Sequence, residues 1–225
     1  MSTLRSRIEE VRARIRTAAQ SCGRDADSIR LIAVSKTYPV EVIREAAACG
    51  LTAFGENRVQ ELVPKMESGP SEAEWHMIGT LQTNKIKYLA HRVDWIDSVP
   101  SVKALEEIEK RASAAGRVIY VLIQVNISDE DQKSGCEPGD LPALLSAAER
   151  LPHVAVRGLM GIASLEADPD VVRPQFRALR ELRDTHLGPD AELSMGMSHD
   201  MEVAIEEGST MVRIGSSIFG QRTVF

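Results

Sequence analysis

The sequence has no long hydrophobic run and little cysteine. No segment approaches the roughly 18 consecutive apolar residues that a membrane-spanning helix needs, and the first residues form neither a signal core nor a cleavage site. The three cysteines, Cys22, Cys49 and Cys136, are far apart and form no CxxC pair or secreted disulfide framework. We therefore expect reduced thiols, a cytoplasmic protein and no membrane partner.

Excess positive charge and the common metal and nucleotide motifs are also missing. The 27 basic residues are outnumbered by 33 acidic residues, and the net charge of -6 disfavours a nucleic-acid partner. The five histidines are scattered, without HExxH or another metal-ligand spacing, so we expect no metal. No P-loop, GxGxxG or GxSxG sequence occurs, which disfavours the nucleotide sites and the hydrolase elbow that these motifs mark.

What the sequence does contain is ordinary globular composition and a regular alternation of two patterns. Hydrophobic residues make up 43% of the 225 residues, enough to bury a core. Apolar residues at helical spacing predict an amphipathic helix within residues 1–23 that packs on the rest of the chain. Eight short segments rich in Val and Ile are predicted as strands: Leu31–Ser35, Thr52–Gly55, Trp75–Ile78, Trp95–Val99, Val118–Val125, Val154–Ile162, Glu192–Met195 and Met211–Ile214.

Segments of helical character separate these strands. They begin near Pro39, Arg58, Gln82, Ser101, Pro138, Pro169 and Ser198. Strict alternation implies parallel strands with right-handed crossovers, and strands that are apolar nearly throughout are typical of a sheet covered by helices. The pattern predicts an α/β fold, a single (β/α)8 TIM-type barrel domain over residues 1–225 with an extra N-terminal helix. An open doubly wound sheet is the alternative.

Lys36 is the first candidate for chemistry. It ends the first predicted strand, directly after Leu-Ile-Ala-Val-Ser, at the barrel face where active sites lie. Apolar walls disfavour the charged ammonium and so favour a nucleophilic amine. The alternative is an ordinary solvated lysine at a strand end, and position alone leaves both interpretations open.

Two glycine-containing turns follow the seventh and eighth strands, the usual phosphate position in barrels. Ser198 is the expected N-cap of the helix after the first turn, whereas Gly215 and Ser216 offer close backbone approach and polar donors in the second. We predict a phosphate site there, with two ordinary capped turns as the alternative. Arg213 lies inside the last strand and requires a buried partner, either a neighbouring carboxylate or a ligand atom.

Three other polar side chains are interpreted as structural. His76 lies within a predicted strand, where a hydrogen-bonded core histidine is the favoured interpretation. His199 is interpreted as a solvated residue at a helix start, although it is close enough in sequence to reach the site. Tyr38 follows Lys36 by two residues and is expected to pack against the rim of the barrel rather than to donate protons.

A series of short segments resembles the pyridoxal phosphate homeostasis proteins. The segments run in order from about residue 30 to Gly220: Ala33–Thr37, Phe54–Arg58, Trp75–His76, Ile78–Gly79, Leu81–Gln82, Gln124–Ile127, Lys133–Gly135, Arg157–Met160, Ser194–Ser198, Asp200–Glu202 and Arg213–Gly215. Any one of them would be a weak signal, but the ordered combination is highly specific.

The resemblance implies a barrel that is similar to the N-terminal domain of alanine racemases and binds pyridoxal 5'-phosphate (PLP). Lys36 would carry the cofactor as an internal aldimine. The other cofactor-binding residues that it implies are Asn57, Ile78, Ser198, Arg213, Gly215 and Ser216. Of these, the serines and the glycine would hold the phosphate, the arginine would lie beside the pyridine nitrogen, and the asparagine would line the ring.

Three positions depart from the usual pattern of the family. Thr80 stands where proline is usual, and His199 stands where a small or acidic residue is common. Ser216 replaces a threonine but keeps the hydroxyl group, so phosphate binding is expected to survive.

Members of this family are regarded as carriers or regulators of PLP without an established reaction. The expected function is therefore PLP homeostasis without catalytic residues, with PLP and PLP-dependent apo-enzymes or B6-metabolising enzymes as partners. A PLP-dependent amino-acid racemase is the first alternative. It needs an acid–base group on each face of the substrate, and no residues remain after Phe225 for a second domain that would supply the second group. This also favours a monomer. A cofactor-free Schiff-base lyase on a sugar phosphate is the second alternative.

Overall fold

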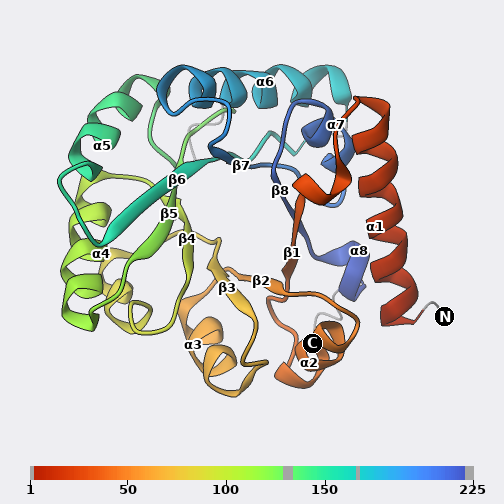
Figure 1. The fold of residues 1–225 in the computed structure, drawn as a ribbon, viewed down its shortest axis with the longest axis horizontal. Coiled ribbons are helices and arrows are strands. Elements are labelled where there is room, and N and C mark those ends of the chain that lie inside the picture. Colours follow the sequence, from red (N-terminus) through yellow and green to blue (C-terminus); the bar gives the residue numbers. More distant parts are fainter. Residues whose placement is uncertain (1–2, 129–133, 166–167, 221–225) are drawn as a thin grey trace.

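The computed structural model describes residues 3–128, 134–165 and 168–220, and its strands close into a barrel (Figure 1). The eight parallel strands pair in sequence order, and β1 pairs with β8 to complete the ring. They are β1 (Arg30–Val34), β2 (Ala53–Glu56), β3 (Glu74–Met77), β4 (Trp95–Val99), β5 (Ile119–Gln124), β6 (Val154–Met160), β7 (Glu192–Ser194) and β8 (Met211–Ile214). The predicted barrel is confirmed and the open-sheet alternative is wrong. Lys133, in one of the segments that carry the resemblance, lies outside the described residues.

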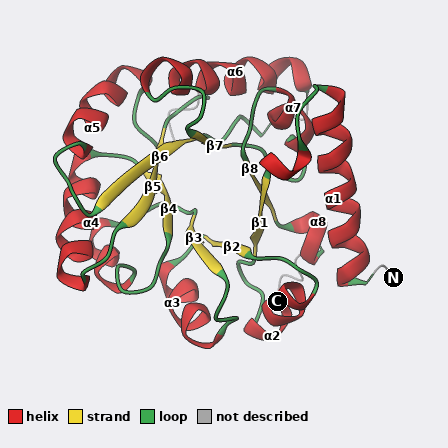
Figure 2. Cartoon of the chain, viewed as in Figure 1, coloured by secondary structure: helices red, strands yellow, loops and turns green. Residues whose placement is uncertain are grey.

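Helices surround the barrel and separate its strands (Figure 2). They are α1 (Leu4–Ser21), α2 (Val40–Ala48), α3 (Val59–Ser68), α4 (Val102–Ala115), α5 (Leu141–Ala148), α6 (Pro169–His186), α7 (Met201–Glu206) and α8 (Ser216–Phe219), with 3-10 turns η1 (Ala26–Ser28), η2 (Thr83–Tyr88) and η3 (Pro138–Asp140). The segment after Gln82 is thus a short 3-10 turn rather than an α-helix. Among the described helices, none combines the length and the apolar character that crossing a bilayer requires.

The start of α7 differs from the prediction for a physical reason. Ser198 does not cap this helix, because the helix begins three residues later and Asp200 occupies the N-cap position. The carboxylate of Asp200 accepts a hydrogen bond of 2.5 Å from the backbone N–H of Met197. The chain from Met197 to Asp200 is therefore a turn, which leaves Ser198 outside the helix.

Alternate residues of each strand point into the barrel, where an apolar layer fills the interior. This layer consists of Ile32, Ala53, Trp95, Leu122, Met160 and Met211. The strands are not apolar throughout, however, since β3 contains the buried His76. The ring of His76 stacks on Trp95 with centroids 5.4 Å apart, and its Nδ1 and Nε2 atoms lie 3.0 Å from Oδ1 of Asp97 and 3.0 Å from Oε1 of Glu74. The interpretation of His76 as a hydrogen-bonded core histidine is confirmed.

The charges inside the barrel balance one another. Burial alone would lower the pKa of His76, but the charge and hydrogen bond of Asp97, together with those of Glu74, raise the pKa to about 9. The imidazolium is therefore charged at neutral pH. It compensates the fully buried carboxylate of Asp97, which also interacts with the charge of Arg213.

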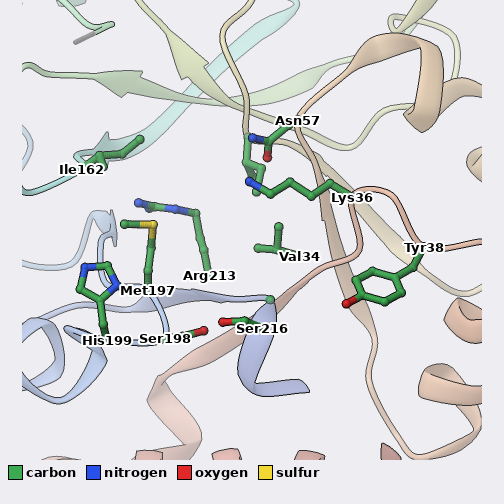
Figure 3. Close-up of a pocket in the computed structure, with 12 residues that line it drawn as sticks. Val34, Lys36, Tyr38, Asn57, Ile162, Met197, Ser198, His199, Arg213 and Ser216 are labelled. Carbon is green, nitrogen blue, oxygen red and sulfur yellow. The ribbon is translucent and has the colours of Figure 1, made fainter. Parts of the chain in front are cut away.

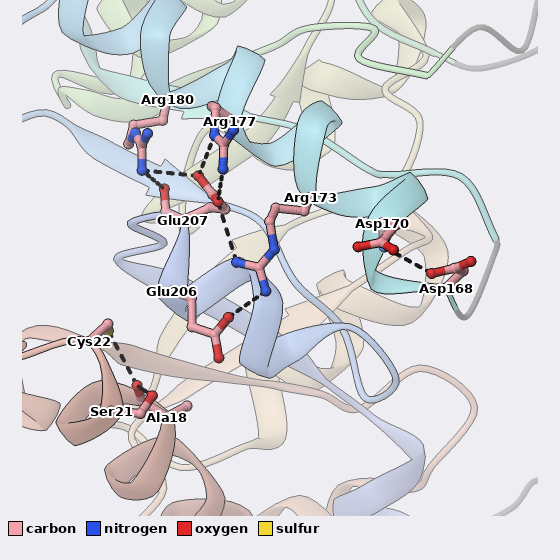
Figure 4. Close-up of polar contacts among 10 residues, drawn as sticks. All are labelled: Ala18, Ser21, Cys22, Asp168, Asp170, Arg173, Arg177, Arg180, Glu206 and Glu207. Carbon is pink, nitrogen blue, oxygen red and sulfur yellow. Dashed lines mark hydrogen bonds and ion pairs between the residues drawn. The ribbon is translucent and has the colours of Figure 1, made fainter.

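Three arginines of α6 bind the chain at the end of α7 (Figure 4). Oε1 of the buried Glu207 lies 2.9 Å from Arg177 and 3.4 Å from Arg173, and Oε2 lies 3.0 Å from Arg180. Arg173 also pairs with Glu206 at 2.6 Å. These ion pairs fix the C-terminal end of α7 against α6.

Helix α1 lies outside the barrel, against α7 and α8 (Figure 1). The side chain of Thr3 caps it by accepting a hydrogen bond of 3.2 Å from the N–H of Ser6. Its buried residues recur at helical spacing: Leu4, Ile8, Val11, Ile15, Ala18 and Ala19. The helix therefore packs on the two elements that follow the predicted phosphate turns.

Candidate functional site

A cavity of about 310 Å³ opens at the carboxyl ends of the strands (Figure 3). It is lined by Val34, Lys36, Tyr38, Asn57, Ile78, Ile162, Met197, Ser198, His199, Arg213, Gly215 and Ser216. All seven residues that the sequence implies as cofactor-binding are in this lining, although they lie in or after five different strands, β1, β2, β3, β7 and β8. The structure thus brings the whole predicted set to one place.

Lys36 reaches the cavity from a tight turn. The N–H of Tyr38 donates to the carbonyl of Ser35 at 3.1 Å, so Lys36 and Thr37 are the two central residues of this turn. Thr37 has φ +70°, a left-handed conformation that is costly for a β-branched residue. The backbone that carries Lys36 is therefore held in one specific and strained conformation.

A buried polar cluster behind this turn was not found from the sequence. Ser35 donates to Oε1 of Glu56 at 2.7 Å, and Nζ of Lys65 donates to the same atom at 2.7 Å and to the carbonyl of Ser35 at 3.0 Å. Glu61 completes the cluster by accepting the N–H of Thr37 at 2.7 Å. The cluster thus holds the backbone on either side of Lys36, at Ser35 and at Thr37. Its one sequence signal is a glutamate at the end of the otherwise apolar strand β2.

Glu56 is an unusual member of this cluster because it is fully buried. Burial raises the pKa of Glu56, and the hydrogen bonds and charge of Lys65 and the hydrogen bond of Ser35 oppose this effect without cancelling it. Its Oε2 atom has no hydrogen-bond partner among the described residues. The carboxyl group therefore depends on Lys65 for most of its compensation.

The two predicted phosphate turns face each other at one end of the cavity. The hydroxyl groups of Ser198 and Ser216 point toward one another, on the side of the cavity away from the Lys36 amine (Figure 3). The backbone N–H groups of Ser216 and Ser217, at the start of α8, have no acceptor among the described residues. This end of the cavity therefore presents several hydrogen-bond donors to a ligand.

Arg213 contributes a buried cation to the cavity wall. Its guanidinium donates to the hydroxyl of Ser194 at 2.7 Å and to the carbonyl of Gly161 at 2.9 Å. No carboxylate of the described chain lies within ion-pair distance of it, so the neighbouring-carboxylate alternative is wrong for these residues. Burial lowers the pKa of Arg213, and the charges of Asp97 and Asp200 oppose this effect.

Asn57 and Ile78 line the cavity between the Lys36 turn and the middle of the barrel. A glycine is required beside them, because a Cβ atom on Gly79 would lie 2.2 Å from the carbonyl oxygen of Asn57. Tyr38 packs on Phe219 with ring centroids 4.9 Å apart, and its hydroxyl donates to a backbone carbonyl, as expected for a residue at the rim. His199 is exposed to solvent, as expected, but it also lines the cavity, which the sequence left open.

The residues present fit PLP. The volume is within the range of about 300–1,000 Å³ that is usual for small-molecule sites. The lining contains an amine, a buried guanidinium, hydroxyl groups and free N–H groups, and it contains no carboxylate among the described residues. Such a set of donors suits a small molecule with an aldehyde and an anionic tail.

Comparisons with known proteins agree with this assignment. The family model for "Alanine racemase, N-terminal domain" matches residues 7–223. A pyridoxal phosphate homeostasis protein of Aquifex aeolicus is 48% identical over 221 residues, which cover 96% of this chain and 97% of that protein. A pyridoxal phosphate homeostasis protein of Pseudomonas aeruginosa is 46% identical over 99% of this chain and 97% of its own length.

Solved structures share the fold. PipY of Synechococcus elongatus, solved with PLP bound, has a TM-score of 0.83 and 34% identity, covering 97% of this chain and 100% of PipY. An alanine racemase of Clostridium difficile has a TM-score of 0.78 at 14% identity and covers 98% of this chain but 57% of its own. The second likeness concerns the barrel fold alone.

Proposed function

The chain belongs to the pyridoxal phosphate homeostasis protein family, and from this membership and the cavity we propose that it binds PLP covalently and buffers or delivers it. The observation that carries the proposal is one cavity lined by Lys36, Arg213, Ser198 and Ser216 with no carboxylate among its described lining residues. A carrier needs a reversible bond and an anion site, and these side chains supply both.

Each lining residue has a role in this proposal. The amine of Lys36 condenses with the PLP aldehyde to form a Schiff base, and one water is released. A competing amine can reverse this bond. Ser198, Gly215 and Ser216 bind the phosphate through hydroxyl and backbone N–H groups. Asn57 and Ile78, which complete the predicted set, line the ring.

The position of Arg213 favours binding over catalysis. When bound, PLP supplies an electron sink for carbanion chemistry, and this sink is strongest when its ring nitrogen is protonated. A guanidinium beside that nitrogen opposes its protonation, because two positive charges would then be adjacent in a buried site. We therefore propose that the chain holds PLP in a form with weak catalytic capacity.

A racemase-like enzyme is the second candidate, and one observation favours it. The imidazole of His199 lines the cavity, with its Nε2 atom 3.4 Å from Oδ2 of Asp200. It could serve as an acid–base group in addition to Lys36. This candidate would be favoured over a carrier if the PLP-loaded protein converts L-alanine to D-alanine and the His199→Gln variant does not.

The proposal is tested by borohydride reduction of the protein after incubation with PLP, followed by mass spectrometry of its peptides. We expect one PLP adduct, on Lys36, and no adduct in Lys36→Ala. Lys103→Ala, which removes an exposed lysine of α4, is the matched control and should retain the adduct. Wild-type protein without an adduct, or with the adduct on another lysine, would contradict the proposal.

Carrier and enzyme differ in what happens to the bound PLP. We expect a PLP-dependent apo-enzyme mixed with the loaded chain to gain activity as the chain loses its bound PLP.

We further propose that residues 1–225 act as one cytoplasmic domain and as a monomer, with PLP and the enzymes that use or make it as partners.

A further inference from the structure

Helix α1 contacts the first turn at the anion end of the cavity and the short helix α8 that follows the second turn, although α1 is not part of the barrel ring. It lies against α7, which follows the turn after β7, and against α8, which follows the turn after β8 (Figure 1). Two arginines on this helix donate hydrogen bonds to the backbone of these elements. The contacts join residues about 180 to 210 positions apart in the sequence.

Arg14 binds the first turn. Its Nη2 atom donates to the carbonyl of Ser198 at 3.2 Å, and its Nε and Nη2 atoms donate to the carboxylate of Glu202 at 2.7 and 3.0 Å. Burial alone would raise the pKa of Glu202, but the hydrogen bonds from Arg14 and the backbone lower it, so the carboxylate is charged at neutral pH. Glu202 thus fixes the guanidinium that binds Ser198.

The contact at Ser198 determines the direction of the next N–H group. The C=O and N–H of a trans peptide point in opposite directions, and Arg14 binds the Ser198 carbonyl from the side of α1. The N–H of His199 therefore points away from α1. No acceptor for this N–H occurs among the described residues, which leaves it available to a ligand.

Arg7 binds α8, the short helix that follows the second turn. Its Nε atom donates to the carbonyl of Ile218 at 2.6 Å, which satisfies an acceptor at the C-terminal end of α8. On its other side, the same short helix is fixed by the hydroxyl of Tyr38, which donates to the carbonyl of Gly220 at 3.0 Å. Helix α8 is a single short turn, so these two contacts, together with the burial of Ile218 and Phe219, determine where Ser216 lies.

We propose that Arg7 and Arg14 are positioning residues, which hold the two phosphate turns at the spacing that a phosphate group requires. The proposal rests on the proposed function, because it assigns to α1 a part in retaining the phosphate of PLP. Neither arginine lines the cavity. They act through the backbone of Ser198 and α8, so removing them should weaken phosphate binding without removing any ligand contact.

The test compares PLP with pyridoxal, which has the aldehyde but no phosphate. Dissociation constants for both are measured by absorbance for wild type, Arg7→Ala, Arg14→Ala and Arg14→Lys. Arg16→Ala, an exposed arginine of the same helix, is the control. We expect each alanine variant to bind PLP roughly tenfold more weakly, as for one lost hydrogen bond to a charged group, and to bind pyridoxal as wild type does.

Arg14→Lys keeps the charge but not the forked geometry, and we expect it to recover part of the PLP affinity. If the alanine variants bind PLP and pyridoxal equally more weakly, the change reflects a general loss of structure and overturns the proposal. The proposal is also overturned if Arg7→Ala and Arg14→Ala bind PLP as tightly as Arg16→Ala does. Wild-type protein that binds no PLP would instead overturn the proposed function and this inference with it. The two failures are therefore distinguishable.

Discussion

Thr37 stores strain directly beside the amine that the proposed function requires. Among the described residues it is the one non-glycine residue with positive φ, at +70°. The N–H of Thr37 donates to Glu61, and the turn around it is closed by Ser35 and Tyr38. Because these contacts impose the conformation, the strain is a property of the surroundings of Lys36 and not of its side chain.

Replacing Thr37 by glycine should stabilise the protein. A left-handed residue with a Cβ atom costs about 1–2 kcal/mol, and glycine avoids this cost at a smaller entropic penalty. We expect Thr37→Gly to raise the free energy of unfolding by about 1 kcal/mol in urea denaturation. Thr37→Ala keeps the Cβ atom and serves as the control. If Thr37→Gly is no more stable than Thr37→Ala, the left-handed conformation at this position is not strained and the prediction is wrong.

The buried cluster of Glu56 and Lys65 allows a second prediction at this scale. Lys65→Met leaves the Glu56 carboxyl group buried without its cation, which should cost about 3 kcal/mol of unfolding free energy. Adding Glu56→Gln removes the charge and should restore much of the loss. Lys103→Met, on the exposed face of α4, should change little. Equal stabilities of the single and double variants in urea denaturation would show that the pair is not coupled.

At the scale of elements, ion pairs connect neighbouring strands inside the barrel and neighbouring helices outside it. Strands β3 and β4 are joined inside the barrel by the pair of His76 and Asp97, at 3.0 Å. Helices α6 and α7 are joined outside it by Glu207 and three arginines (Figure 4). Burial alone would raise the pKa of Glu207, but its arginine partners lower it, so this contact weakens only in acid. The strand pair has the opposite dependence on pH.

The contribution of His76 should decrease as the pH rises. Its pKa of about 9 in the folded chain exceeds the ordinary value of 6.5, so the stabilisation is complete below 6.5 and is lost as the pH rises through 9. The loss amounts to about 3 kcal/mol. We therefore expect the difference in unfolding free energy between wild type and His76→Gln to shrink between pH 6 and pH 10. His91→Gln, an exposed control, should show no such change, and a constant difference for His76→Gln would contradict the assignment.

At the scale of the whole molecule, barrel closure is what assembles the site. Lys36 follows β1 and Ser216 follows β8, and these two strands are adjacent because the sheet closes on itself. Helix α1 then spans the outer face of the last two helices. A ligand that bridges Lys36 and the turn after β8 therefore connects the first and last strands and should stabilise the entire fold.

This stabilisation can be measured by thermal unfolding with PLP. A ligand that binds only the folded state adds about 2.7 kcal/mol at 100 times its dissociation constant. For a chain of this size, that corresponds to a rise in Tm of about 5–10 °C. We expect Lys36→Ala to lose at least half of the rise. A wild-type Tm that does not change with PLP would contradict binding to the folded chain.

The strands and the cavity residues follow from the sequence to a large extent. Predicted and observed bounds are identical for β4 and β8 and differ by one or two residues for the other strands. Lys36, Arg213 and Ser216 could be singled out because each lies within or just after an apolar strand, where a polar residue is unusual. Prediction was less successful at Ser198, because a local hydrogen bond from Met197 to Asp200 delays the helix and local propensity does not reveal it.

The order of strands and helices, the α/β class and the strand ends at which the candidate site lies are thus determined by hydrophobic periodicity and by the position of polar residues along the chain. Only the tertiary structure decided how buried charges are compensated and what supports the site from behind. Glu56 with Lys65, His76 with Asp97, and Arg14 with Ser198 are pairs of this kind. Their members are polar residues on different elements, and each choice of partner depends on the strand register and helix packing that barrel closure imposes, which no local pattern in the sequence encodes.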